Sequence, residues 1–194
     1  MHHRGSKGMT EAATKTTTTW TIDPSHSVVE FAVKHMMFTT AKGRFEDFAG
    51  TIVFDEQNVE NSRVDVTIKT ASVNTNTADR DAHLRSADFF DSEKYPEATF
   101  RSTRVEPRGD NSFVVYGDLT IKDVTKEIAL EASYLGSGKN PWGVEVAGFE
   151  AKTSFNRKDF GLTWNQALES GGVLVSDEVK LNLEIQAQRV EDQA

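Results

Sequence analysis

The sequence predicts an all-β protein, an extended antiparallel barrel of eight strands with a short helical lid. Apolar and polar residues alternate along eight separate segments, which is the period of half-buried strands. No long amphipathic helix accompanies them, and one segment, residues 77–96, instead combines charged and aromatic residues in a helical pattern. Closing eight amphipathic strands into a barrel removes the exposed edges that would otherwise favour aggregation.

The first three strands are expected between Val29 and Ile68. Odd positions from Val29 to Met37 share one face of the first strand, and the chain then turns at Lys42 and Gly43. The next two strands alternate in the same way, with apolar residues at Phe48, Ile52 and Phe54, and at Val64, Val66 and Ile68. The remaining strands are expected at 98–105, 112–120, 127–135, 142–155 and 177–188.

The expected lid follows the third strand. Thr77 or Asn76 caps its helix, so that Asp79 and Asp81 fall in the first turn, where carboxylates suit the unpaired N–H groups. Ser86 is a second cap, at which the helix restarts. An all-β domain does not need this insertion for its sheet, and we therefore expect it to cover the mouth of the barrel.

Composition excludes several classes of protein. The formal charge of −8, with acidic and basic residues interspersed, argues against nucleic acid as a partner, because phosphate binding requires a concentrated basic surface. No apolar run is long enough to cross a bilayer, so we expect no stable membrane insertion. The absence of Cys excludes disulfides and thiolate metal sites.

The chain divides into two regions. Residues 1–19 are polar and rich in Thr, and we expect a disordered leader there, because they offer too little apolar surface to offset the entropy of ordering. They also lack the apolar core of a signal peptide, so we expect the chain to remain in the cytoplasm. Residues 20–190 form the expected single barrel domain.

Five segments of this domain carry a resemblance to a known family. They are WTIDPSHSVVEFAVKH from Trp20, GRFEDFAGTI from Gly43, RDAHLRSADFFDSEKYP from Arg80, GDLTIKDVTKEI from Gly117 and NRKDFG from Asn156. In this ordered series the chain resembles the YceI-like family of lipid-binding proteins, over residues 20–187.

The resemblance implies a lipocalin-like barrel that holds a long polyisoprenoid chain, such as an isoprenoid quinone or its precursor, in an apolar tunnel for transport or storage. It brings no catalytic residue and no cofactor, so we expect a carrier rather than an enzyme. A fatty acid or fatty amide is the alternative ligand, and a homodimer is a further expectation.

We expect the ligand-binding residues on the inward faces of the strands and on the lid. The predicted set is Phe31, Val33, His35, Met37, Phe38, Phe48, Ile52, Val64, Val66, Ile68, Arg80, His83, Phe89, Phe90, Phe100, Leu119, Leu130, Phe155, Leu181 and Leu183. Arg80, together with Asp81 and Arg85, could clamp a lipid head group, since Arg presents a fork of donors. The alternative is an ion-pair cluster that holds the lid.

The histidines offer a metal-binding alternative. His26, His35 and His83, with Asp81, could supply the ligands of a zinc ion. No two of the histidines have a local ligand spacing, so we expect no metal site. We predict instead that His26 and His83 hydrogen-bond the lid to the first strand.

An enzyme acting on an isoprenoid substrate is the last alternative. His83 and Asp81 would then be acid and base partners, and Ser25 or Ser27 would be the nucleophile of a hydrolase. The sequence contains no nucleophile elbow and no oxyanion device, so a binding protein remains the prediction.

Overall fold

The structure is a computed structural model that describes residues 16–169 and 173–191. Its strands are β1 (Thr17–Ile22), β2 (Val28–His35), β3 (Thr39–Phe45), β4 (Phe48–Asp55), β5 (Arg63–Lys69), β6 (Val73–Asn74), β7 (Glu97–Gly109), β8 (Ser112–Ile121), β9 (Val124–Lys139), β10 (Glu145–Asn156) and β11 (Glu178–Arg189). The helical elements are η1 (Pro24–His26), η2 (Val59–Asn61), η3 (Thr70–Ser72), α2 (Ala78–Arg85) and η4 (Arg157–Phe160).

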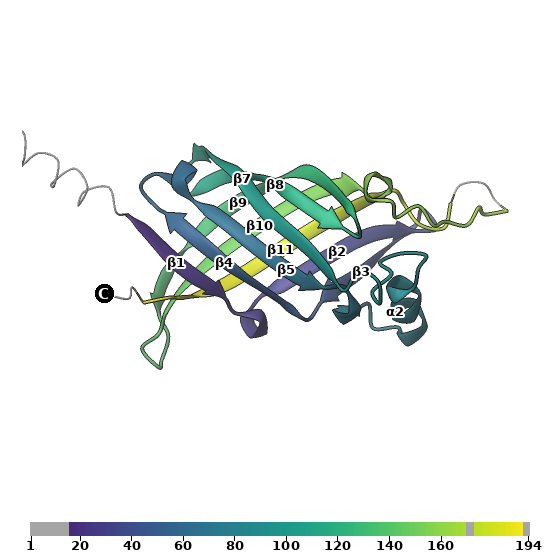
Figure 1. Cartoon of the computed structure of the whole chain (residues 1–194), viewed down its shortest axis with the longest axis horizontal. Coiled ribbons are helices and arrows are strands. Elements are labelled where there is room, and N and C mark those ends of the chain that lie inside the picture. Colours follow the sequence, from purple (N-terminus) through teal and green to yellow (C-terminus); the bar gives the residue numbers. More distant parts are fainter. Residues whose placement is uncertain (1–15, 170–172, 192–194) are drawn as a thin grey trace, which may run out of the picture.

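The strand segments form eight passes of a closed antiparallel barrel, which confirms the predicted architecture (Figure 1). Three passes are interrupted: β1 continues into β2, β3 into β4, and β5 into β6, each across a short turn. β11 closes the barrel, since it pairs with β10 on one edge and with both β1 and β2 on the other. The uninterrupted strands β7 to β11 form the other part of the wall.

The barrel begins earlier than the sequence predicted. Thr17 to Thr19 already belong to β1, because they pair with Asp55 to Val53 of β4. The boundary expected at Trp20 is therefore three residues late. The first fifteen residues of the expected leader lie outside the described residues.

The predicted turn at Lys42 and Gly43 is wrong, because both residues lie within β3. β2 ends at His35, and the chain reverses at residues 36–38. Gly43 pairs with Phe31, and the Phe31 ring occupies the space that a Cβ at this glycine would need. The glycine therefore admits an aromatic ring of the facing strand and does not mark a reversal of the chain.

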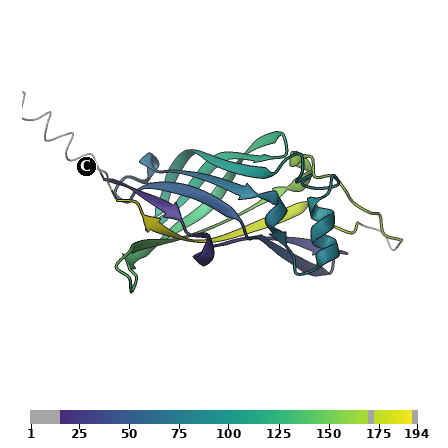
Figure 2. The same cartoon turned by 60° about the horizontal axis from the view of Figure 1, so that its bottom comes forward.

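The lid lies at one end of the barrel, where Figure 2 shows α2 beside the strand ends. Asp79 and Asp81 lie in the first turn of α2, as predicted, and Thr77 occupies the N-cap position, although its side chain makes no capping hydrogen bond. The helix does not restart at Ser86, which is instead its C-terminal cap.

Residues 86–95 continue the lid as consecutive turns. The backbone N–H of Asp91 donates to the carbonyl of Ser86, and that of Ser92 donates to the carbonyl of Arg85. These bonds fold the segment back onto the end of α2, which explains why no second helix forms.

No helix in the described ranges is long and apolar enough to span a bilayer.

The interior contains two clusters of buried apolar side chains. The smaller cluster consists of Ile22, Val29, Phe45, Phe48 and Val73. The larger cluster includes Trp20, Phe54, Phe100, Phe113, Val115, Leu119, Leu130, Phe149 and Phe160. Ile52, Val66 and Leu183 pack against both clusters, so the apolar interior is continuous.

Candidate functional site

A cavity of about 560 Å³ extends inside the barrel from the lid toward the opposite end. Ligand sites for small molecules commonly occupy about 300–1,000 Å³ and are mostly apolar, so this cavity has the size and the lining of a binding site. Every residue of the predicted ligand-binding set except Met37 and Phe38 lines it. Lining residues that the predicted set omitted include Ile22, Val29, Phe45, Phe54, Leu84, Phe113, Phe149, Leu162, Trp164 and Leu174.

Met37 and Phe38 are the two predicted residues that the structure places outside the cavity. They lie in the turn between β2 and β3, and their exposed fractions are 60% and 83%. The sequence continued the alternation of the first strand through Met37, whereas the strand ends at His35. Their predicted role as lining residues is therefore wrong.

The end of the barrel opposite the lid is filled by aromatic rings. Phe54 packs against Phe113, Tyr134 and Phe149, with ring centroids 6.1, 4.8 and 5.2 Å apart. Tyr134 and Phe149 are also neighbours, at 5.5 Å. These side chains come from β4, β8, β9 and β10, and Phe54, Phe113 and Phe149 line the cavity at this end.

The mouth of the cavity carries several polar lining residues, among them Thr75 and Arg80. Arg80 donates through Nε to Thr75 Oγ1 and through Nη2 to the Thr75 carbonyl, both at 2.8 Å. Asp81 Oδ1 accepts from the backbone N–H of Thr75 at 2.8 Å. Among the described residues, Arg80, Asp81 and Arg85 form no ion-pair cluster, because Arg80 and Asp81 both bind Thr75. The ion-pair alternative is therefore wrong, and Arg80 lines the cavity while its Nε and Nη2 atoms bind Thr75.

The lid closes the mouth with its aromatic residues. Phe89 is buried, and its ring centroid lies 5.1 Å from that of His83. Phe90 points to the other side and packs edgewise against Phe45 of β3, at 5.6 Å. The Nε2 atom of His83 lies 2.9 Å from a carboxylate oxygen of Asp88. His83 therefore bonds within the lid.

A segment without regular structure, which we call the strap (residues 162–169 and 173–176), lies beside the lid and contributes Leu162, Trp164, Leu174 and Val175 to the cavity wall. The sequence analysis missed it, because it has neither the period of a strand nor that of a helix.

The side chain of Arg157 holds the strap through hydrogen bonds. Its side chain is buried, and its Nε donates to the carbonyl of Ser176 at 2.9 Å. Its Nη1 donates to the carbonyls of Leu162 at 2.6 Å and Trp164 at 2.9 Å. Burial lowers the pKa of Arg157, and the charge of Asp177 opposes that change. The guanidinium group thus holds carbonyls of the strap, while the side chain of Asn165 binds both the N–H and the carbonyl of Val175.

His26, His35 and His83 lie in three different elements of the described structure. His26 Nδ1 lies 2.9 Å from Asp23 Oδ2 in η1, His35 ends β2, and His83 bonds to Asp88 in the lid. Within residues 16–169 and 173–191, no three His, Cys, Asp or Glu side chains are placed to hold a metal ion. The predicted hydrogen bonds of His26 and His83 between the first strand and the lid are also absent from this part of the chain.

The candidate triad of a hydrolase is likewise separated. Asp81 binds Thr75 and not His83. The hydroxyl of Ser25 donates to Asp23 at 2.6 Å, and that of Ser27 donates to the Gln186 carbonyl at 3.2 Å. These contacts give each group a local structural role.

A closed antiparallel barrel with an apolar cavity, one filled end and one lidded mouth defines a class of protein that encloses an apolar ligand. The chain belongs to the YceI-like family, since the model of the YceI-like domain matches residues 20–187. Protein YceI of Escherichia coli is 49% identical over 137 residues, which are 71% of each chain. A UPF0312 protein of Photorhabdus laumondii is 49% identical over 139 residues, or 72% of each chain.

Solved structures have the same fold. The YceI protein of Campylobacter jejuni superposes with a TM-score of 0.70 at 37% identity, over 81% of this chain and 90% of that chain. A polyisoprenoid-binding domain from Saccharophagus degradans, described as implicated in plant cell wall breakdown, has a TM-score of 0.64 at 16% identity. The match covers 88% of this chain and 98% of that domain, and it shows the fold alone.

Proposed function

We propose that this protein binds a long-chain isoprenoid lipid, such as an isoprenoid quinone or its precursor, in the barrel cavity for transport or storage. The observation that carries the proposal is the cavity of about 560 Å³, whose apolar wall continues from the lid to the aromatic rings at the far end. A continuous apolar lining suits a hydrocarbon chain, because it offers the chain no polar partner along its length.

The energetics of such a site favour tight binding. A chain that buries about 500 Å² of apolar surface would gain roughly 12 kcal/mol before the costs of ordering, at about 25 cal/mol per Å². The polar group of the lipid would remain at the mouth, where Arg80 offers the Nη1 donors that Thr75 leaves free. The tail thus supplies affinity and the mouth selects the head group.

Family membership and the polyisoprenoid binding named for the Saccharophagus degradans domain support a binding protein rather than an enzyme. The arrangement of His83 and Asp81 adds to this view, since each bonds to a different partner, and the candidate nucleophiles Ser25 and Ser27 bond to Asp23 and Gln186 instead. A fatty acid or fatty amide is the alternative ligand, and the mass of the extracted lipid distinguishes it from an isoprenoid.

The test combines native mass spectrometry with a matched pair of variants on β11. Leu183 lines the cavity, whereas its neighbour Asn182 is exposed and does not line it. We expect Leu183→Trp to fill the cavity and to abolish the lipid adduct, and Asn182→Trp to retain it. Wild-type protein that carries no lipid, and takes up none from a supply of isoprenoid quinone, would refute the proposal.

A further inference from the structure

The turn between β2 and β3 presents three large apolar side chains to solvent. Met36, Met37 and Phe38, which we call the apolar tip, have exposed fractions of 38%, 60% and 83%. Exposed apolar residues are ordinary when scattered singly, whereas three consecutive large ones at the end of a hairpin mark an interaction site.

The backbone of the apolar tip makes this choice of residues more unusual. Phe38 donates its N–H to the carbonyl of His35 at 3.1 Å, and the two central residues, Met36 and Met37, have φ angles of 53° and 66°. This is the pattern of a type I′ turn, in which Asn-Gly is strongly preferred because both central residues adopt positive φ. Two methionines are unfavourable here both for the backbone and for exposure to water, so folding alone does not explain them.

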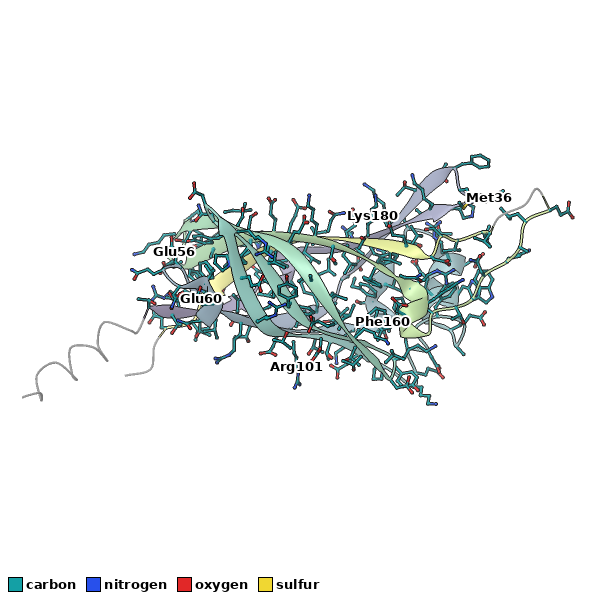
Figure 3. All side chains as sticks on the ribbon, turned by 90° about the horizontal axis from the view of Figure 1, so that it is seen from above. Met36, Glu56, Glu60, Arg101, Phe160 and Lys180 are labelled. Atoms are coloured by element: carbon teal, nitrogen blue, oxygen red, sulfur yellow. The ribbon has the colours of Figure 1, made fainter. Side chains whose placement is uncertain are left out.

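The apolar tip adjoins the mouth of the cavity. The N–H of Met36 donates to the carbonyl of Leu174 in the strap at 2.8 Å, and Lys34, His35 and Leu174 all line the cavity. Figure 3 shows Met36 at one end of the molecule and Glu56 at the other. The apolar tip therefore lies at the mouth of the cavity and projects into solvent.

We propose that the apolar tip docks shallowly on the surface of a phospholipid bilayer, with the mouth of the cavity toward the lipids. The inference rests on the proposed function, since a lipid that is held in the cavity reaches it from a membrane. Methionine and phenylalanine side chains enter the boundary between head groups and acyl chains, as they do in peripheral membrane proteins. Lys34 and Lys42 lie on the strands beside the tip, where an ammonium group can meet a lipid phosphate.

A second copy of the chain fits the apolar tip less well. A stable protein interface buries about 1,200–2,000 Å² in total, which three side chains on a convex turn do not approach. Because the whole chain has a formal charge of −8, attraction to anionic lipids is weak, and apolar contact is the main source of binding. Association with the bilayer should therefore change little with salt.

The test is co-sedimentation of the purified full-length protein with vesicles of phosphatidylethanolamine and phosphatidylglycerol. The variant Met36→Asn/Met37→Gly/Phe38→Ser removes the apolar tip and gives the turn its preferred residues, so we expect it to fold with an equal or higher Tm. Vesicle binding of this variant should weaken at least about tenfold, because its apolar contact is lost. The control is Trp142→Ser, which removes a side chain that is 83% exposed, in the turn between β9 and β10.

Full vesicle binding by the tip variant, or equal loss in the Trp142→Ser control, would overturn the inference. Wild-type protein that pairs in solution through the tip and ignores vesicles would overturn it as well. The lipid content of the purified protein is measured separately. Protein that docks on vesicles, carries no lipid and takes up none refutes the proposed function, whereas protein that carries lipid and does not dock refutes only the docking inference.

Discussion

Trp164 of the strap packs edge to face against His83 of α2, with ring centroids 4.5 Å apart and ring planes at 87°. Phe89 completes the group, since its centroid lies 5.4 Å from that of Trp164. The lid and the strap are thus joined by aromatic contacts, which are worth about 0.5–1.5 kcal/mol per pair beyond their buried area. A ligand that passes through the mouth must separate these rings.

The first prediction concerns ligand release through the lid. We expect Phe89→Ala/Phe90→Ala to remain folded, though less stable, and to release bound lipid roughly tenfold faster, since affinity differences within one site appear mainly in the off-rate. Stopped-flow transfer of a fluorescent isoprenoid to acceptor vesicles measures this rate. Leu135→Ala, which truncates a 62% exposed side chain on β9, is the control. An unchanged release rate in the folded double variant would mean that the ligand leaves by another route.

The second prediction concerns the buried guanidinium group of Arg157. Replacing it in Arg157→Met leaves the carbonyls of Leu162, Trp164 and Ser176 without their donor, which should lower the free energy of unfolding by about 3 kcal/mol. The exposed neighbour Lys158 pairs with Asp177 at 3.4 Å, and Lys158→Met should cost less than about 1 kcal/mol. Urea denaturation compares the two, and equal losses would contradict the anchoring role of Arg157.

The third prediction is a dependence of stability on pH through Asp55. Hydrogen bonds from the Thr16 hydroxyl, from Asn61 and from the backbone N–H groups of Asn58 and Gln57 lower the pKa of this buried carboxyl below 3.8. Because the folded pKa is the lower one, Asp55 stabilises the fold fully above pH 3.8 and loses this effect as the pH falls through the folded value.

We therefore expect Asp55→Asn to be less stable at pH 7 and to lose less additional stability than wild type between about pH 4 and pH 2. Denaturation across that range provides the measurement. Asp65→Asn, which alters an exposed carboxylate on β5, should follow the wild-type profile. A profile for Asp55→Asn parallel to that of wild type would refute the assignment.

The fourth prediction compares two glycines that lie under aromatic rings. A Cβ at Gly117 would lie 2.7 Å from the carbonyl oxygen of Arg101, which is backbone, whereas a Cβ at Gly43 would meet only the side chains of Phe31 and Thr75. Gly117→Ala should cost about 1–3 kcal/mol, because β7 and β8 must separate, and Gly43→Ala should cost less, because a ring can shift. Thermal unfolding ranks the two, and the reverse order would contradict this account.

Much of the barrel could be predicted because its strands bury one face. The alternation of Leu181, Leu183 and Ile185 with Asn182 and Glu184 specifies both the strand and its orientation, and β11 has this register. The same rule predicted most of the cavity wall. The same rule extended the first strand too far, to Met37, because a period of two contains no information on where a strand ends.

Other features depend on contacts that no local pattern records. Gly43 was interpreted as a turn, although the ring of Phe31 on the facing strand accounts for it. The strap follows hydrogen bonds from its carbonyls to the side chain of Arg157, so its sequence has no period to detect. Both errors concern side-chain contacts, which the periodicity of a single sequence does not reveal.

In the proposed function, the aromatic rings packed around Phe54 at the end opposite the lid leave the lidded mouth as the route of the lipid. A lipid must then enter tail first and leave head first, so its head group faces outward throughout its stay. The lipid is then loaded and unloaded through the same mouth. The donor and the acceptor of the lipid must therefore approach the protein one after the other. With the proposed function, such a protein would act as a shuttle that docks, departs and docks again, and would not act as a conduit between two partners that are held at once.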